Sequence, residues 1–315
     1  MISQTLPHRR IVKQLAFAIL IAVCLFPFIT PPIALAVGLF FGWLFNDEPG
    51  ALHRTAARIL LQASVVGLGF GIDLLTIVEV SQVGIGFTIA VVFVALLLGT
   101  WGGRRLGLSC STTHLISSGT AICGGSAIAA LGPVVKAEEQ EMSVALGTVF
   151  MLNAVALFSF PFVAQILAMT PLQFGVWTAI AIHDTSSVVG AAARHSSEAL
   201  AIATTVKLGR TLWLIPLLVL TGVLFRGRTS GFPIPFFVAF FVVASFLRTV
   251  AAPIAEISPT IVSLARIGLT ITLFLIGSML TRRMVRNVGA KPFVHGAILW
   301  IVISLSSLLA VVSLL

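Results

Sequence analysis

Long uncharged, apolar stretches follow one another along most of the chain. Residues 14–46 form 33 consecutive positions without a charge, and residues 142–183 form 42. Apolar residues run on continuously within them, as in residues 86–99 (GFTIAVVFVALLLG), instead of alternating with polar ones. A continuous run satisfies its backbone in lipid as a helix, whereas a barrel strand alternates over roughly ten residues. The pattern therefore predicts an all-α integral membrane protein.

Charges, prolines and glycines divide these stretches into eleven predicted transmembrane helices. A continuous span needs roughly 20 residues, and several here are shorter or are interrupted by glycine and polar residues. The predicted helices cover about 11–27, 32–45, 54–72, 80–103, 111–134, 140–168, 172–193, 199–225, 234–248, 259–280 and 292–314. We interpret residues 1–315 as a single polytopic transmembrane domain.

Composition agrees with a chain whose main solvent is lipid. The sequence is 58% hydrophobic and 9% charged, against roughly 25% charged in soluble domains. The net charge of +9 does not indicate nucleic acid, because membrane proteins gather Lys and Arg in short cytoplasmic loops. The three cysteines lie in or beside apolar segments and indicate no disulfide framework.

The distribution of cations predicts the orientation. With eleven spans and a cytoplasmic N-terminus, cytoplasmic segments hold 13 Lys and Arg residues and the opposite side holds 5. Those five are Lys136, Arg194, Lys207, Arg210 and Arg248. This asymmetry predicts a multi-pass membrane protein with its N-terminus inside and its C-terminus outside.

A short internal repeat links the third and tenth predicted helices. Residues 57–59 (ARI) begin a segment that leads to residues 71–74 (GIDL), and residues 265–267 (ARI) begin one that leads to residues 277–280 (GSML). Helices seven apart in an alternating order are antiparallel, so the match would be an inverted repeat, which is common among transporters.

The fifth predicted helix contains small and hydroxyl residues that make a poor helix in mid-span. The candidates for binding substrate there are Gly119, Thr120, Cys123, Gly124, Gly125 and Ser126. One interpretation is close helix packing through small residues. The other is a helix break, whose free N–H groups and half-helix N-terminus favour an anion.

The seventh predicted helix carries His183 and Asp184, followed by the candidate binding residues Thr185, Ser186 and Ser187. A carboxylate in mid-span costs about 2.5–3.5 kcal/mol, so Asp184 must face a polar cavity or a partner. Asp184 could cap a half-helix that starts near Thr185. It could also take up a coupling proton or sodium ion, with His183 as a second coupling candidate, and the two roles are compatible.

The eighth predicted helix places Lys207 and Arg210 on one face, together with Thr204 and Thr211. Two cations beside an apolar run suit an oxyanion. The alternative is that both side chains extend to lipid headgroups. Because the positive-inside rule disfavours cations on the outer side, we favour burial of Lys207 and Arg210 against the fifth and seventh helices.

Other chemistries find no support in the sequence. There is no metal-ligand spacing, and no Gly-Lys-Ser/Thr phosphate loop that would indicate ATP-driven pumping. We therefore expect no cofactor, no metal site and no catalytic residues. The expected partners are a small anion, a coupling proton or sodium ion and the lipid bilayer, and a homodimer is compatible with these features.

At the three motifs the chain resembles the YeiH-type family of bacterial inner-membrane proteins, which carries the label of sulfate exporter. The resembling residues are 121–128 (AICGGSAI), 181–185 (AIHDT) with Val188 and Val189, and 206–208 (VKL) with Arg210. The similarity extends over most of the chain. Because that family is grouped with cation/proton antiporters and anion transporters, the resemblance implies inverted repeats, broken helices near the midplane, and separate core and scaffold bundles.

The resemblance also implies that Asp184 is the coupling or binding carboxylate, with Lys207 and Arg210 as its cationic partners. The leading hypothesis is a secondary active transporter that exports or exchanges a small anion such as sulfate or a sulfonate. A cation/proton antiporter of the same fold is the second hypothesis, with Asp184 carrying the cation. The third is a membrane enzyme or a non-transporting receptor.

Overall fold

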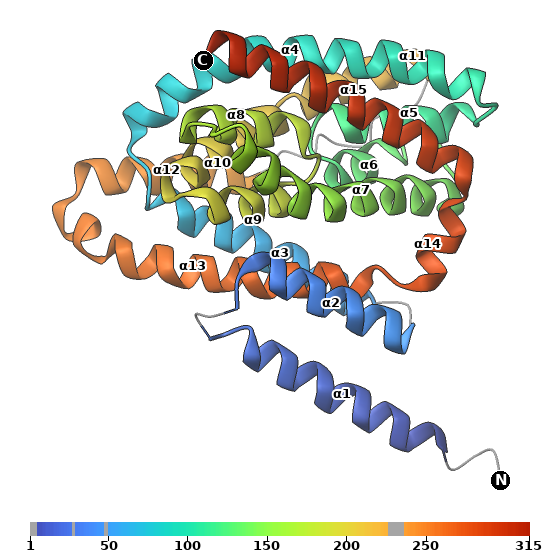
Figure 1. The fold of residues 1–315 in the computed structure, drawn as a ribbon, viewed down its shortest axis with the longest axis horizontal. Helices are drawn as coiled ribbons and strands as arrows, with labels where there is room; N and C mark the ends of the chain where they lie inside the picture. Colours follow the sequence, from blue (N-terminus) through green and yellow to red (C-terminus); the bar gives the residue numbers. More distant parts are fainter. Residues whose placement is uncertain (1–4, 27–28, 47–49, 226–235) are drawn as a thin grey trace.

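The computed structural model describes residues 5–26, 29–46, 50–225 and 236–315, and all the regular structure in these ranges is helical (Figure 1). The helices are α1 (Thr5–Val23), α2 (Pro31–Phe45), α3 (Ala51–Gly69), α4 (Leu74–Arg105), α5 (Cys110–Ala121), α6 (Gly125–Leu131), α7 (Glu139–Ile166), α8 (Pro171–Ala181), α9 (Thr185–His195), α10 (Ser197–Thr211), α11 (Leu214–Leu224), α12 (Phe236–Val250), α13 (Ala252–Met279), α14 (Arg282–Val288) and α15 (Ala290–Leu314).

Helix lengths and hydropathy identify a multi-pass membrane protein. In the described parts of the chain, five helical segments are long and apolar enough to cross a bilayer: Gly86–Arg105, Glu139–Ile166, Ser197–Leu224, Ala252–Met279 and Ala290–Leu314. Three shorter apolar helices, Ile11–Val23, Ile33–Phe45 and Phe236–Val250, accompany them. Position 27 of the first predicted helix and positions 234–235 of the ninth lie outside the described residues, as do Arg226 and Arg228.

The fifth predicted helix is not a span. The chain enters the protein as α5, breaks at residues 122–124 and returns as α6. Gly119 in α5 faces Ile128 in α6, so the two arms lie side by side. The Ser109 hydroxyl at the start of α5 donates a hydrogen bond to the Glu141 carboxylate in the first turn of α7. Both ends of this segment are therefore on the same side, and α5–α6 is a re-entrant hairpin, here called hairpin 1.

The seventh predicted helix is a second re-entrant hairpin. It consists of α8 and α9, with a break at residues 182–184. His195 at the end of α9 lies 3.2 Å from the carbonyl oxygen of Met169, which precedes α8. The His195 ring also stacks on Phe174, with ring centroids 4.7 Å apart. A spanning helix would separate these residues by the thickness of the bilayer, so α8–α9 returns to its own side and is called hairpin 2.

The two hairpins enter from opposite sides of the protein. Hairpin 1 follows the C-terminal end of α4, where Gly102 faces His295 near the start of α15. We call this end, which carries Arg104 and Arg105, the basic side. Helix α7 leads from it to the other side, where hairpin 2 begins (Figure 1). Since hairpin 1 returns to the side it came from, Lys136 lies on the basic side, which corrects the predicted opposite location.

The helices outside the hairpins contain the predicted inverted repeat. Helices α3 and α13 pack antiparallel, with Gly67 against Ala265 and Gly268 against Ser64. Equivalent positions are 208 apart in the ARI match, and Gly69 and Gly277 have the same separation. The predicted match of residues 71–74 with residues 277–280 is therefore out of register by two residues. A Cβ added to Gly277 would lie 2.5 Å from the α2 carbonyl oxygen of Leu35, and one added to Gly69 would lie 2.6 Å from the α12 carbonyl oxygen of Phe241. Thus α2 packs on α13 as α12 packs on α3.

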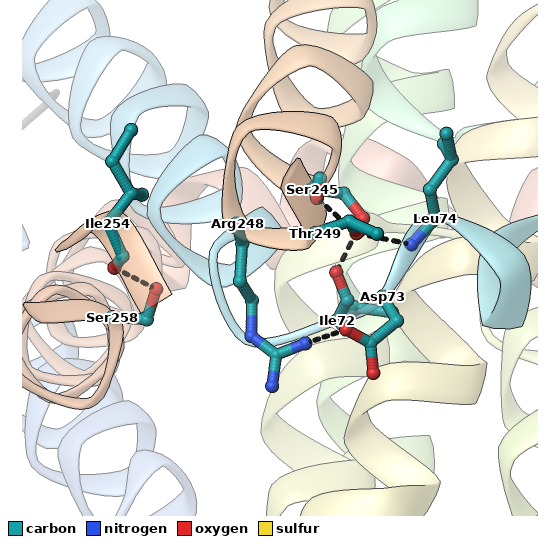
Figure 2. Close-up of polar contacts among 8 residues, drawn as sticks. All are labelled: Ile72, Asp73, Leu74, Ser245, Arg248, Thr249, Ile254 and Ser258. Carbon is teal, nitrogen blue, oxygen red and sulfur yellow. Dashed lines mark hydrogen bonds and ion pairs between the residues drawn. The ribbon is translucent and has the colours of Figure 1, made fainter. Parts of the chain in front are cut away.

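Two similar hydrogen bonds, each from a backbone N–H to a side-chain oxygen, join the two repeats at opposite ends. On the side away from the basic side, the Leu74 N–H at the start of α4 donates to the Thr249 hydroxyl oxygen of α12 at 3.1 Å (Figure 2). An ion pair between Arg248 and Asp73 lies beside this bond. At the basic side, the Arg283 N–H in α14 donates to the side-chain oxygen of Asn46, just after α2, also at 3.1 Å. Each repeat therefore fixes the helix that follows the other repeat.

The helices form two bundles, as the resemblance implied. A scaffold consists of α1, α2, α3, α12 and α13, which pack mainly on one another. A core consists of both hairpins with α4, α7, α10, α11 and α15 (Figure 1). Helix α14, which the sequence pattern did not reveal, packs on α7 between α13 and α15. The core bundle holds all three polar motifs.

The hairpins make a prediction about sidedness. In proteins that carry single cysteines, native Cys110 and Glu139→Cys should react with a membrane-impermeant maleimide from one side of the membrane. Thr170→Cys and Glu198→Cys should react from the other side, since all four positions are exposed at the hairpin ends. Reaction of Cys110 and Glu139→Cys from opposite sides would show that α5–α6 crosses the membrane.

Candidate functional site

The tips of the two hairpins meet inside the core bundle. Gly124 at the break of hairpin 1 has φ +63°, a conformation that favours glycine. A Cβ at this position would lie 3.4 Å from the Cβ of His183, which is in the break of hairpin 2. The sequence interpretation of a helix break is confirmed for both motifs, and the breaks are in contact.

Lys207 of α10 joins the two tips through their backbone. Its side chain is fully buried. Its Nζ donates to the carbonyl oxygens of Ile122 at 3.1 Å, Ile182 at 2.6 Å and Ala179 at 3.4 Å. An ammonium group has three N–H donors, so these three bonds use all of them. Lys207 therefore holds both hairpins and keeps no donor for another ligand.

Arg210 lies one turn further along α10 and caps the same helix ends. Its side chain is also fully buried. Nη1 donates to the carbonyl oxygens of Ala179, at 3.2 Å, and Ile180, and Nη2 donates to that of Ala121. The Nε–H has no hydrogen-bond partner among the described residues. Burial of both cations against the hairpins is confirmed, and neither extends to the headgroups.

The breaks explain why two cations are buried there. The last carbonyl groups of a helix have no partner within the helix, and in lipid each such group costs several kcal/mol. The partial negative charge at the C-termini of α5 and α8 attracts cations as well. Backbone oxygens thus replace the carboxylate that a buried cation usually needs. Within the described part of the chain, no ion pair joins Asp184 to Lys207 or Arg210.

Asp184 caps α9, as the sequence allowed. Its carboxylate accepts from the Ser187 N–H at 3.3 Å and from the Ser186 hydroxyl. Unlike the two cations, Asp184 is only partly buried. A partly buried carboxylate at a helix N-terminus satisfies free backbone donors and retains access to solvent. The cap is established, and the coupling role stays a prediction.

The remaining candidate residues divide between packing and the tips. Gly119 serves the close packing of the two hairpin arms, since a Cβ there would lie 3.0 Å from Ile128. Thr120 and Cys123 are buried near the tip, with 1% and 2% exposure. Gly125 is partly buried at the start of α6, whereas Ser126 is exposed. Thr185 is buried at the start of α9. Their roles in binding remain predictions.

The structure adds Asn153 of α7, which the sequence did not single out. It is buried, and its Oδ1 accepts from the backbone N–H of His183 at 3.1 Å. Its Nδ2 has no partner among the described residues, and the same is true of both ring nitrogens of His183 and of the Thr120 hydroxyl. A single Asn between apolar residues gives no sequence signal, and only the folded contacts reveal it.

The charges around this centre do not balance. Lys207, Arg210 and Asp184 lie beside four helix ends, each with about half a charge. The C-termini of α5 and α8 are negative, and the N-termini of α6 and α9 are positive. The helix ends cancel one another, which leaves an excess of about one positive charge in a buried place. The described residues contain no group of three His, Cys, Asp or Glu side chains that could hold a metal ion.

The fold and the centre define a helical membrane protein with two opposed re-entrant hairpins, joined by buried cations. The chain belongs to the family described as Conserved hypothetical protein 698, whose model matches residues 4–296. This membership is consistent with the YeiH-type resemblance.

Similar proteins carry the name UPF0324 membrane protein. The one from Porphyromonas gingivalis is 49% identical over 89% of this chain and 86% of its own length. The one from Bdellovibrio bacteriovorus is 42% identical over 98% of this chain and 97% of its own length. No solved structure is a significant match to the chain.

Removing the Lys207 ammonium should destabilise the core. Lys207→Met removes the donor of the Ile122 and Ile182 carbonyl groups, whereas Ala179 keeps its bond from Arg210. The loss should cost at least about 3 kcal/mol, because hydrogen bonds to charged groups contribute roughly 1.5–3 kcal/mol each. Thermal unfolding of the detergent-purified protein measures the change. Lys291→Met is the matched control, since Lys291 is exposed at the start of α15. Equal melting temperatures for the two variants would contradict the capping role.

Proposed function

We propose that the protein is a secondary active transporter of the bacterial inner membrane that exports or exchanges a small anion, such as sulfate or a sulfonate. The observation that carries this proposal is the meeting of two oppositely inserted hairpins at buried Lys207 and Arg210. Secondary transporters with inverted repeats bind their substrates near the midplane, at broken helices. This centre has that position and an excess of positive charge.

The balance of charges favours an anion over a cation as the substrate. Asp184 is the sole acidic residue between Glu141 and Glu198, a stretch that includes α8, α9 and nearly all of α7. A cation as the main substrate would add its charge to a centre that already holds two buried cations. One carboxylate does not offset that charge, which supports the anion transporter over the cation/proton antiporter.

The two cations have separable roles in this proposal. Lys207 is saturated by backbone carbonyls and holds the hairpins together. The Arg210 guanidinium has five N–H donors. It makes three hydrogen bonds to carbonyl oxygens, and its Nε–H has no partner among the described residues. We therefore assign direct contact with the anion to Arg210. The electrostatic contribution of Lys207 reaches the anion without a bond.

Asp184 would couple transport to a proton or sodium ion. It lies at the tip of hairpin 2, is partly exposed and is bonded by the Ser186 hydroxyl and the Ser187 N–H. Neutralising it would raise the positive charge beside the anion site. Uptake of a cation at Asp184 and binding of the anion would then favour each other, as linkage between two sites requires.

The orientation follows from the hairpins and the positive-inside rule. The basic side carries Arg104, Arg105, Lys136 and the three arginines of α14. The described part of the opposite side has Arg194 and Arg248. We infer that the basic side faces the cytoplasm and that the N-terminus lies there.

The coupling role can be tested with Asp184→Asn. Asparagine is as good an N-cap as aspartate, so the variant should fold normally. It should lose sulfate flux driven by a pH gradient in proteoliposomes, because the amide cannot take up a proton. Glu198→Gln, which removes an exposed acid at the open end of hairpin 2, away from its tip, should retain the flux of the unmodified protein. Normal flux in Asp184→Asn would reject the coupling role.

A parallel assay separates the proposed function from its alternatives. Sodium-driven quenching of a pH-sensitive dye, without any effect of sulfate, would instead support the cation/proton antiporter. Product formation from lipid substrates without flux of either ion would support a membrane enzyme.

A further inference from the structure

We propose that Asn153 is a substrate-contacting residue of the anion site, which donates a hydrogen bond from Nδ2 to the transported anion. This inference rests on the proposed function and deepens it. It assigns a neutral hydrogen-bond donor on α7 to a site otherwise described by the hairpins and α10. Asn153 lies outside the three motifs that the sequence analysis identified.

The position of Asn153 brings it to both hairpin tips. Val149, one turn before it on α7, faces Gly119 and Gly124 of hairpin 1. Asn153 itself accepts from the His183 N–H of hairpin 2. Its side chain is 2% exposed. It therefore lies at the level where the two breaks meet, and bulk water does not reach it.

The hydrogen bond to His183 fixes which way the amide faces. A backbone N–H can only donate, so the Asn153 oxygen must be the atom that it meets. The Nδ2 group, with its two N–H donors, is then turned away from the His183 backbone. Buried polar groups in native proteins almost always have a partner. An Nδ2 without one among the described residues is a buried donor available to a ligand.

Other unpartnered atoms are concentrated at the same place. Ten buried side-chain nitrogen and oxygen atoms have no hydrogen-bond partner in the described structure. Five of them belong to Thr120, Asn153, His183 and Arg210, which lie on the two tips or on the helices beside them. The nitrogens of Asn153 and Arg210 can only donate, so the ligand that satisfies them must accept hydrogen bonds. A small oxyanion fits this requirement and the positive charge of the centre.

The architecture gives Asn153 a counterpart in the other half of the core. Helix α7 follows hairpin 1, and its Asn153 reaches the tip of hairpin 2. Helix α10 follows hairpin 2, and its Lys207 reaches the tip of hairpin 1. Each span thus carries one polar side chain to the opposite hairpin. Asn153 differs from Lys207 in keeping donors free, and this difference points to the ligand.

The deciding variant is Asn153→Asp, which is nearly isosteric. Its carboxylate still accepts from the His183 N–H, so the support of hairpin 2 remains. It lacks the Nδ2 donor and adds negative charge, so binding of the anion should weaken at least tenfold near neutral pH. As the pH falls and the carboxyl group is protonated, it regains a donor, and binding should recover.

The measurement is thermal stabilisation of the purified full-length protein by sulfate at constant ionic strength, together with the half-saturating concentration for sulfate flux in proteoliposomes. Thr148→Val is the control. Thr148 is fully buried on the same helix, but its hydroxyl donates to Val144 within α7. This variant should bind sulfate as the unmodified protein does.

The possible outcomes are distinct. If sulfate binds Asn153→Asp and the unmodified protein equally well, Asn153 only supports hairpin 2 and the inference is overturned, while the proposed function stands. If neither sulfate nor a sulfonate stabilises the unmodified protein or crosses the membrane, the proposed function fails and this inference fails with it. If Asn153→Asp does not fold, Asn153→Ser decides the question. A raised half-saturating concentration supports the contact, and an unchanged one overturns it.

Discussion

The structure depends on how two interrupted helices satisfy their backbone inside a membrane. Helices α5 and α8 both end inside the core, away from water that could donate hydrogen bonds to their terminal carbonyl groups. Lys207 and Arg210 supply the missing donors, and they bond to carbonyl oxygens of both hairpins. The tips and α10 are consequently one mechanical unit. Moving one tip relative to the other would break bonds that lipid cannot replace.

The same arrangement solves the opposite problem of placing cations in the membrane. A Lys or Arg in mid-span costs about 2.5–3.5 kcal/mol on insertion, and a carboxylate partner is the usual compensation. Here the carbonyl groups at the helix ends provide it, so Asp184 remains free to cap α9. Helix breaks and cations are therefore interdependent. Without the cations the breaks would be too costly, and without the breaks the cations would have no partners.

The sequence predicted much of this fold, because apolar runs and charges are local signals. All eleven predicted segments are helical over most of their described residues, and burial of Lys207 and Arg210 followed from the mismatch with the positive-inside rule. The re-entry of α5–α6 and α8–α9 was missed, since a hairpin and a span of equal length have the same hydropathy. Each missed hairpin removes one crossing of the membrane, so the orientation of the chain before hairpin 1 and after hairpin 2 is as predicted. Only the segment between the two hairpins has the opposite orientation, and Lys136 consequently lies on the basic side. Contacts between distant residues, such as Ser109 with Glu141, were needed to reveal the hairpins.

The repeat and the chemistry of the site obey different symmetries. In the scaffold, Gly69 and Gly277 make equivalent contacts, so both halves share one packing rule. In the core, hairpin 1 has a glycine-rich tip without a titratable carboxylate, whereas hairpin 2 carries His183 and Asp184. A symmetric frame lets the two hairpins approach the midplane from opposite sides with similar geometry. In the proposed function, an asymmetric pair of tips would let one centre distinguish an anion from its coupling ion, because the proton- or sodium-binding group would belong to one hairpin. The buried cations of α10 bond to both tips, so a displacement of one tip changes the contacts of the other.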